Sequence, residues 1–474
     1  MSKSREALFL GLAAIILLLI AWHRAPEYDE AYSLFLTAGH ARPSWPHGIF
    51  TAGAARELYA GHAGFGQIST ALRMGDVHPP LYFWALELWR RLTGPSWLAA
   101  RGLSVLFTLG TLLALARLAR RANVPVGPAL ALTLLSYGFA YTGIVARDFA
   151  LAQLLDMLGV LALFGAAQQN SRNHALAGGL AFGAASFTNY LAVFTAGAAL
   201  LWLLWRRQWR AACIAMGGMA LFLPVDLFFF LAQRDSRAGQ FAAFSLPHAL
   251  ARLARDGGAA WFGGLPLYAG WAEVPVILAL AGLFLAGLWH VARRRHEQAG
   301  LFALLALATP LGLLLLGVVF NNSPIEIRYL GFAMPWVALL LAPALPRWLL
   351  ALFLTVQAGA IAGLGLAPAT MQPQARAAHL AARYAGALVL LPFGNDGVGV
   401  PGPFIAAAPD DMRILLIHPG AKLPDNPDTV RVALRVDEAS RAVAARMHCA
   451  GLVCGPALGL TPGGGADEQQ KHRE

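Results

Sequence analysis

Long apolar segments recur along the chain and set its fold class. A helix needs about 20 predominantly apolar residues to cross a bilayer. Eleven segments are predicted to span: residues 7–22, 97–118, 128–146, 149–167, 175–190, 191–205, 211–231, 273–291, 299–320, 329–346 and 348–366. Their length is that of helices rather than of barrel strands, so the pattern predicts an all-α polytopic membrane protein with about 11 transmembrane helices. The short pair 175–190 and 191–205 also fits one broken hairpin.

Composition agrees with this class and excludes others. The 474 residues are 58% hydrophobic and 13% charged, whereas soluble domains carry about 25% charged residues. The net charge of +11 does not indicate a nucleic-acid partner, because the basic residues cluster in short connectors between apolar segments, as membrane topology signals do. The N-terminus resembles a signal peptide, but "AWHRAP" offers no small-residue cleavage site, so we predict an uncleaved first helix.

The arginine distribution predicts the topology. Cytoplasmic connectors of membrane proteins are rich in Lys and Arg. If residues 78–94 do not span and the N-terminus is cytoplasmic, every strong basic cluster falls on the cytoplasmic side. These clusters are Arg117, Arg120 and Arg121; Arg172; Arg206, Arg207 and Arg210; Arg293, Arg294 and Arg295; and Arg347. Residues 78–94 are therefore predicted to form a helix in the outer interface, with Tyr82, Trp84 and Trp89 at headgroup level.

Three domain assignments follow from these patterns. Residues 1–366 form the membrane domain, whose first outer loop is 23–96. Residues 367–460 contain short apolar runs separated by turn signals, which predict a small α/β domain, and residues 461–474 have a disordered composition. Three cysteines, Cys213, Cys449 and Cys454, are too few for a disulfide framework or a Cys-rich zinc module. Whether Cys449 and Cys454 pair stays open.

Polar motifs gather on the predicted outer face. "EYDEA" at 27–31 places Asp29 and Glu30 directly after the first helix. Carboxylates near a low-dielectric medium cost energy unless they have a task or a partner, and one at this position can take a proton from a hydroxyl group or hold a cation. The other motifs are "GDVHPPLYFW" at 75–84, "ARDFA" at 146–150, "TNY" at 188–190 and "SPIEIRYL" at 323–330.

Each motif also has a purely structural explanation. The acids of the first loop fit a solvated helix flank, and Asp76 and His78 fit the start of a helix. Arg147 and Asp148 fit an exposed hairpin, or a site that positions a phosphate or an acid. Arg328 fits either snorkelling to headgroups or a contact with an anion such as a lipid phosphate. The residues alone leave these alternatives open.

Taken in order, the motifs resemble bacterial glycosyltransferases of the GT-C fold, relatives of protein O-mannosyltransferases and of lipid A aminoarabinose transferases. The resemblance covers about residues 1–366 and rests most on Tyr28-Asp29-Glu30 followed by His78-Pro79-Pro80-Leu81-Tyr82. It implies transfer of a hexose or pentose from a polyprenyl-phosphate carrier to an envelope acceptor. It also implies a bacterial inner-membrane location, with the C-terminal domain in the periplasm and membrane lipids as further partners.

The resemblance also implies roles for individual residues. Asp29 matches the family's catalytic carboxylate and is predicted to be the general base, while Glu30 is predicted to position acceptor or donor. Contacts to the donor or its phosphate are expected from His78, Arg147, Arg328 and Tyr329. Further candidates are Tyr28, Asp76, Asp148, Asn189 and Tyr190. Asn189 replaces the His or Lys often found there in the family, which puts a charge role at this position in doubt.

Cofactors, sugar and acceptor stay open. Some relatives bind a divalent metal near these acids and others need none; the candidate ligands are Asp29, Glu30, Asp76 and Asp148. An alternative function is a transporter or flippase of a lipid-linked saccharide, which would need charged residues inside its membrane spans. Asp156 and Asp226, which lie inside apolar runs, are the best candidates for this role. A second alternative is a noncatalytic membrane-anchored sensor whose tail binds a ligand.

Overall fold

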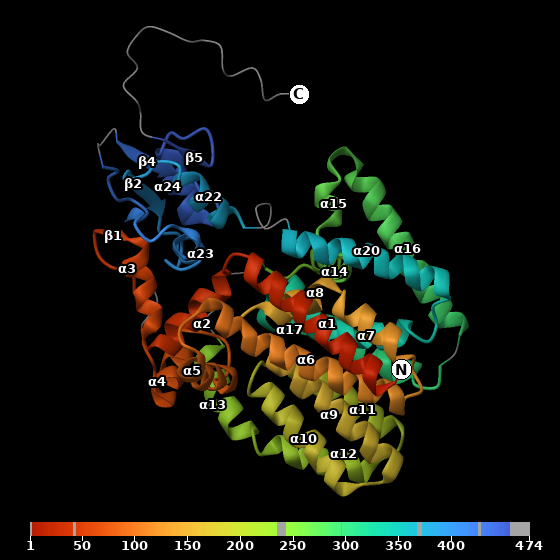
Figure 1. The fold of residues 1–474 in the computed structure, drawn as a ribbon. Helices are drawn as coiled ribbons and strands as arrows, with labels where there is room; N and C mark the ends of the chain where they lie inside the picture. The colour runs from red at the N-terminus through yellow and green to blue at the C-terminus, as the bar shows by residue number, and fades with distance from the viewer. Residues whose placement is uncertain are drawn as a thin grey trace. The chain divides into compact units, whose positions relative to one another are not determined.

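The computed structural model, drawn in Figure 1, describes residues 2–40, 44–234, 243–294, 296–366, 372–424 and 428–455. The predicted disordered tail, 461–474, lies outside these residues. The chain divides into two compact units. Unit 1 comprises Met1–Arg24, Ser33–Ala41 and Gly61–Pro368, and unit 2 comprises Ala25–Tyr32, Arg42–Ala60 and Ala369–Glu474.

Unit 1 is a helical bundle with membrane-spanning helices, as the sequence predicted. Within the described residues, six helices are long and apolar enough to cross a bilayer, and a bent pair is a seventh candidate. The six are α1 (Lys3–His23), α6 (Trp97–Arg121), α9 (Phe149–Gln169), α16 (Glu273–Arg293), α17 (Ala299–Phe320) and α20 (Arg347–Leu366). The pair, α12 (Trp209–Ala220) and α13 (Leu223–Gln233), bends by 56°. The chain is a multi-pass membrane protein.

The other four predicted spans are shorter or interrupted helices. Residues 128–146 become α7 (Val126–Leu134) and α8 (Tyr137–Ile144), and residues 329–346 become α18 (Ile327–Leu330), the 3₁₀ turn η3 (Gly331–Ala333) and α19 (Met334–Leu341). The pair 175–190 and 191–205 forms α10 (Arg172–Ser186) and α11 (Ala192–Trp205). Apolar composition predicted these segments correctly as helical, and it anticipated the junction between 175–190 and 191–205, but it did not reveal the breaks inside 128–146 and 329–346.

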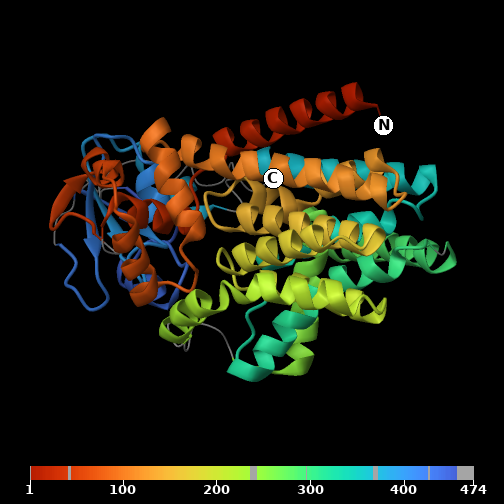
Figure 2. The ribbon, with the colours of Figure 1, turned by 90° about the horizontal axis from the view of Figure 1, so that it is seen from below.

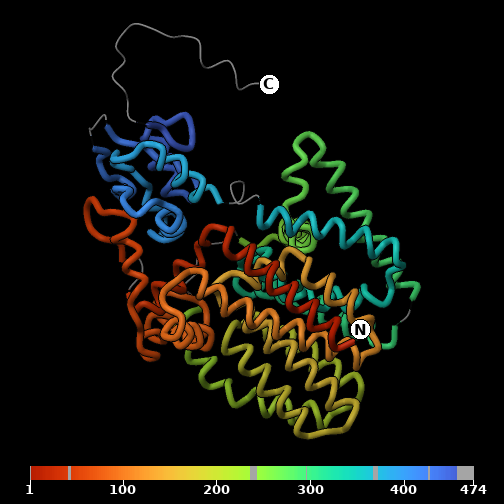
Figure 3. Tube along the Cα trace, in the orientation of Figure 1, coloured from red at the N-terminus to blue at the C-terminus, as the bar shows by residue number. Residues whose placement is uncertain are grey.

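Small residues let the helices of this bundle approach closely. Figures 2 and 3 show α6, α9, α10 and α12 running side by side. A Cβ atom added at Gly179 of α10 would lie 2.1 Å from the carbonyl oxygen of Ala215 on α12, so this crossing requires glycine. At the α9–α10 contact, a Cβ on Gly178 would lie 2.5 Å from a methyl carbon of Leu163. Close backbone packing of this kind is typical of helices in lipid.

The predicted interfacial helix is α5 (Leu81–Thr93), which is too short to be a candidate span. That Tyr82, Trp84 and Trp89 lie at headgroup level stays a prediction. Tyr82 is fully buried, and its hydroxyl lies 3.3 Å from Ser104 Oγ of α6. Trp84 and Trp89 are half-buried and donate to the carbonyls of Phe65 and Ala99. The apolar face of an amphipathic helix can pack against protein or against lipid. The sequence pattern therefore did not reveal that Tyr82 packs inside the protein.

Unit 2 contains a five-stranded sheet in the order β1-β3-β2-β4-β5. The central strands β2 (Leu388–Pro392), β3 (Arg413–Ile417) and β4 (Thr429–Val432) are parallel, while β1 (Ile49–Thr51) and β5 (Val453–Cys454) pair antiparallel at the edges. The three parallel strands coincide with the three apolar runs of the predicted α/β domain. The sequence did not place β1 here, because a three-residue edge strand gives no pattern of its own.

Three helices belong to this sheet region: α22 (Pro373–Ala381), α23 (Pro401–Ala407) and α24 (Glu438–Arg446). Two first-loop segments also lie in unit 2, namely Ala25–Tyr32 and Arg42–Ala60, the second of which forms β1, α3 (Ala52–Glu57) and η1 (Leu58–Ala60). The division therefore falls inside α2 (Tyr28–Ala38), after Tyr32.

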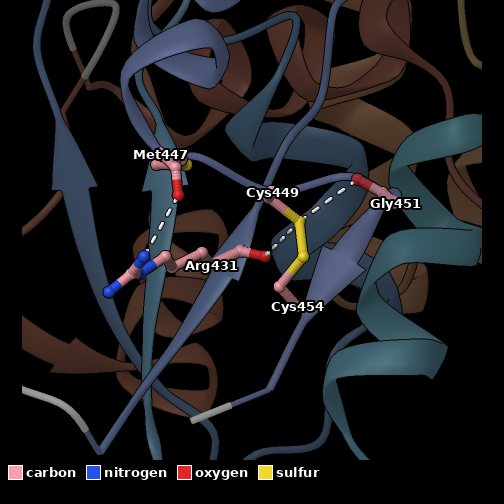
Figure 4. Close-up of a disulfide and its surroundings, with 5 residues drawn as sticks. All are labelled: Arg431, Met447, Cys449, Gly451 and Cys454. Carbon is pink, nitrogen blue, oxygen red and sulfur yellow. Dashed lines mark hydrogen bonds between the residues drawn. A yellow bond between two sulfur atoms is a disulfide. The ribbon is translucent and has the colours of Figure 1, made fainter. Parts of the chain in front are cut away.

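Cys449 and Cys454 form a disulfide, the pairing that the sequence left open. It closes a short loop between α24 and β5 (Figure 4). Beside it, Arg431 of β4 donates from Nη1 to the carbonyl of Met447 at 3.2 Å. Disulfides persist in oxidising compartments and are rare in the cytosol; the outer location of this domain stays a prediction.

Candidate functional site: a buried charged network

The network begins at the end of α4 (Phe65–Gly75), in the segment that leads to α5. Asp76 is the C-cap residue of α4, and its Oδ1 accepts from the backbone N–H of Val77 and lies 2.7 Å from Nδ1 of His78. Asp76 and His78 are both buried. Pro79 and Pro80 then lead into α5, so the chain between the two helices has little freedom to move His78.

Arg147 joins this pair from the short segment between α8 and α9. Its Nη2 lies 3.1 Å from Asp76 Oδ1, 3.2 Å from Asp76 Oδ2 and 2.9 Å from His78 Nδ1. The guanidinium also lies over the ring of Phe83, 5.3 Å from its centroid. Arg147 is almost completely buried, which excludes the exposed hairpin, one of the two explanations that the sequence left open for Arg147 and Asp148. Two residues 71 positions apart in sequence thus form one buried ion pair.

Asp148 completes the network on the other side of Arg147. Its Oδ2 accepts from Asn189 Nδ2 at 2.7 Å and lies 3.8 Å from His78 Nε2, while its Oδ1 lies 3.7 Å from Arg147 Nε. Asp148 is fully buried. Burial raises the pKa of the Asp148 carboxyl above the ordinary aspartate value, although His78 and Arg147 partly oppose the shift. Asp148 therefore holds a proton more readily than a solvated aspartate.

Asn189 has a hydrogen-bonding role and needs no charge. Its amide donates to Asp148, and its Oδ1 accepts from the backbone N–H of Leu191 at 3.0 Å, at the turn between α10 and α11. A lysine cannot accept this backbone hydrogen bond. Asparagine at this position thus serves both hydrogen bonds without a charge.

Gln233 is a buried member of the site that the sequence did not indicate. Its Nε2 donates to the carbonyls of Leu72 and His78, both at 3.0 Å, and its Oε1 accepts from the Tyr190 hydroxyl at 2.9 Å. It therefore links the segment carrying Asp76 and His78 to the turn carrying Asn189. Gln233 ends an apolar helix, where a glutamine gives no distinctive pattern.

Arg328 and Tyr329 lie on α18, and the ring of Tyr329 packs near the residue that follows Asp148. The Tyr329 ring lies 6.3 Å from that of Phe149, the residue that follows Asp148. Arg328 lies over the Tyr329 ring, 5.2 Å from its centroid, and forms an ion pair with Glu326. The Arg328 side chain is 17% exposed, more open than Arg147.

The remaining predicted residues, Tyr28, Asp29 and Glu30, lie in unit 2 at the first turn of α2. Glu30 has a structural task there, because its Oε2 accepts from the backbone N–H of Glu27 at 2.7 Å, and the carbonyl of Glu27 accepts the first bonds of the helix. This is the N3-to-N-cap half of a capping box. Asp29, beside it, is buried. Tyr28 packs against Tyr32, with ring centroids 4.9 Å apart.

The two aspartates of the network pair with other side chains. Asp76 contacts Arg147 and His78, and Asp148 accepts from Asn189. Among the described residues, no group of three or more His, Cys, Asp or Glu side chains is arranged to hold a metal ion.

Asp226, one of the two acids inside apolar runs, has a structural contact. It accepts from Ser186 Oγ at 2.6 Å, which links α13 to α10.

Comparisons with known proteins identify the fold of the chain. The family model described as "Dolichyl-phosphate-mannose-protein mannosyltransferase" matches residues 77–229, which include His78, Arg147, Asp148 and Asn189. The structure of ArnT from Cupriavidus metallidurans bound to undecaprenyl phosphate superposes with a TM-score of 0.52 at 13% identity, covering 88% of this chain and 86% of ArnT. The chain has the GT-C fold.

A second structure supports the same fold for this GT-C protein. ArnT from the same organism in the apo state gives a TM-score of 0.51 at 16% identity, covering 86% of this chain and 85% of ArnT. The mycobacterial arabinofuranosyltransferase AftD gives a TM-score of 0.45, and this chain covers 32% of its length. No curated protein sequence matches this chain significantly. His78, Arg147, Asp148 and Asn189 of the buried network lie within the matched segment, whereas Asp76 and Gln233 lie just outside it.

Proposed function

We propose that this GT-C protein is an inverting glycosyltransferase that moves a monosaccharide from a polyprenyl-phosphate carrier to a hydroxyl group of an envelope acceptor. The observation that carries the proposal is the buried network of Asp76, His78, Arg147, Asp148 and Asn189. Four of these five residues, all but Asp76, lie within the segment matching a mannosyltransferase family, and the fold is that of an enzyme crystallised with undecaprenyl phosphate. A bacterial inner membrane, with the site and unit 2 on the periplasmic face, is part of the proposal.

In the proposed reaction, Asp29 takes the proton of the acceptor hydroxyl as its oxygen forms a bond to the anomeric carbon of the sugar. The bond from that carbon to the phosphate oxygen breaks, and the lipid phosphate leaves with the electron pair. A single displacement inverts the anomeric configuration. Two observations support Asp29 as the base. Its carboxylate is buried, and the neighbouring acid, Glu30, is engaged in capping α2.

The leaving phosphate needs cationic partners. Arg147 offers a positioned guanidinium, but two buried carboxylates already face it. Arg328 is more open and is our candidate for the direct phosphate contact, with Tyr329 packing beneath its guanidinium. His78, fixed between Asp76 and Arg147, is proposed to orient the donor sugar or phosphate. The proposal covers transfer of either a hexose or a pentose.

Replacing Asp29 with Asn tests the proposal. We expect transfer of labelled sugar from a polyprenyl-phosphate donor to fall by about 10²- to 10⁴-fold, the contribution of a general base, while the protein folds normally. Asp411→Asn makes the same change at an exposed aspartate and should leave transfer intact. Retained transfer in the Asp29 variant would remove Asp29 as the base, and lack of transfer by the unmodified chain would contradict the proposed function itself.

A further inference from the structure

A glycine-rich loop in unit 2 packs directly against the first turns of α2. The sequence "GNDGVGVPGP" at 394–403 follows β2 and leads into α23. A Cβ added at Gly399 would lie 2.8 Å from a ring carbon of Tyr28, and one added at Gly402 would lie 2.8 Å from the Cβ of Ala31. Neither distance is tolerated between real atoms, so the backbone of this loop fits α2 only because both positions are glycine.

Asp396 in the same loop adds a polar link to α2. Its Oδ2 accepts from the hydroxyl of Tyr32 at 2.6 Å. Its Oδ1 accepts from the backbone N–H groups of Val398 and Gly399, both at 2.9 Å. One carboxylate therefore shapes the glycine loop and also binds the helix that the loop contacts.

Gln372, directly before α22, holds the chain that enters α2. Its Oε1 accepts from the backbone N–H of Ala25 at 3.1 Å, and its Nε2 donates to the carbonyl of Ala25 at 2.6 Å. The same Nε2 lies 3.4 Å from Glu27 Oε1. Gln372 is buried. The paired amide contact fixes Ala25 as a neighbouring strand would.

These contacts surround Asp29 on both sides along the sequence. Ala25, Glu27 and Tyr28 precede it, and Ala31 and Tyr32 follow it, and each of them contacts Gln372 or the 394–403 loop. We infer that the C-terminal α/β domain is the positioning element for Asp29: Gln372, Asp396, Gly399 and Gly402 set the place of the proposed base. The inference rests on the proposed function and assigns a task to a domain that the sequence left without one.

The physical consequence concerns catalysis more than binding. A misplacement of about 1 Å far from the reacting atoms can cost about 100-fold in rate. A shift of α2 against the loop would move Asp29 relative to the acceptor hydroxyl without removing any group that contacts the donor. We therefore expect kcat to fall while KM for the lipid-linked donor stays the same.

The Gly402→Ala substitution tests this inference in the full-length protein. It places a methyl group against Ala31, and we expect faster amide hydrogen exchange over residues 28–32 with kcat lower by about 10- to 100-fold. The double variant Gly402→Ala with Ala31→Gly removes the opposing methyl group and should restore much of both. Gly451→Ala is the matched control in the same unit, since a Cβ there meets only Val453 O at 3.7 Å.

The outcomes separate the inference from the proposed function. Exchange in residues 28–32 that is unchanged in the Gly402 variant would overturn the contact itself, whatever the activity. Faster exchange with unchanged kcat, or a rise in donor KM as the main effect, would overturn the positioning role. If the unmodified chain transfers no sugar, the proposed function fails and the catalytic consequence fails with it.

Discussion

At the scale of single residues, Arg147 is the group on which the buried network depends most. It is the cation between Asp76 and Asp148, and all three are buried. Removing one partner of a buried ion pair costs about 3–5 kcal/mol, because the other charge remains desolvated. We expect Arg147→Gln to lower the free energy of unfolding by about this amount, measured by denaturation in detergent. Adding Asp76→Asn should recover part of the loss.

A partly exposed ion pair in the same unit provides the control. Arg252 Nε lies 3.4 Å from Asp256 Oδ2, and the Arg252 side chain is 32% exposed. Asp256 keeps a second partner, since Arg255 Nε lies 2.9 Å from its Oδ1, so Arg252→Gln should have little effect. Equal losses for the two arginine variants would contradict the view that Arg147 neutralises buried carboxylates.

Asp148 makes stability depend on pH. Burial raises the pKa of the folded-state carboxyl, whereas the unfolded chain titrates near the ordinary value of about 3.9. Between these two pKa values the folded state binds more protons than the unfolded state. The contribution of Asp148 to the free energy of unfolding is therefore most favourable below about pH 3.9, and it declines as the pH rises to the raised pKa. Asp148→Asn should remove this decline, and unfolding of both proteins over this pH range measures it. An unchanged pH profile would contradict the raised pKa.

At the scale of helices, Gln233 shows how one side chain links separate elements. It connects the segment after α4 to the turn between α10 and α11 from the end of α13. Gln233→Ala removes the partner of the His78 carbonyl and of the Tyr190 hydroxyl, while the Leu72 carbonyl keeps the backbone N–H of Asp76. Each buried group left unsatisfied costs about 1–3 kcal/mol. We expect a clear loss of unfolding free energy and lower transfer activity.

Two further substitutions interpret the Gln233 result. Tyr190→Phe removes only one of the three hydrogen bonds and should cost less. Gln168, which is exposed and donates to the carbonyl of Arg121, is the matched control, and Gln168→Ala should be nearly neutral. A Gln233 variant as stable as the Gln168 variant would mean that water replaces the lost contacts.

At the scale of the whole molecule, the disulfide reports the side of the membrane. In spheroplasts of a Cys213→Ser strain, we expect a membrane-impermeant maleimide to label the protein only after reduction of the Cys449–Cys454 bond. Labelling would then be complete without permeabilising the membrane. Labelling that needs permeabilisation would place unit 2 in the cytoplasm and contradict the proposed topology.

The sequence determined the class of protein and the membership of much of the network. Hydropathy decides which segments partition into lipid, and this local property predicted the helical regions, including those that proved to be broken. Asp76, His78, Arg147, Asp148 and Asn189 stood out because their motifs, taken in order, resemble those of GT-C glycosyltransferases, whereas the residues alone left structural explanations open. Their motifs were recognisable in order along the chain before any contact between them was known.

Only the tertiary structure decided which of these residues meet. Packing of α4, α5, α9 and α10 buries the pairing of Arg147 with Asp76, and no local pattern encodes a contact across 71 residues. The same holds for Gln233, for the burial of Tyr82, and for the glycine loop against α2, where the absent side chains matter because another segment approaches. The hydropathy pattern of a segment indicates whether it is surrounded by water or by an apolar medium. Which distant segment it contacts depends on how the helices and strands pack together.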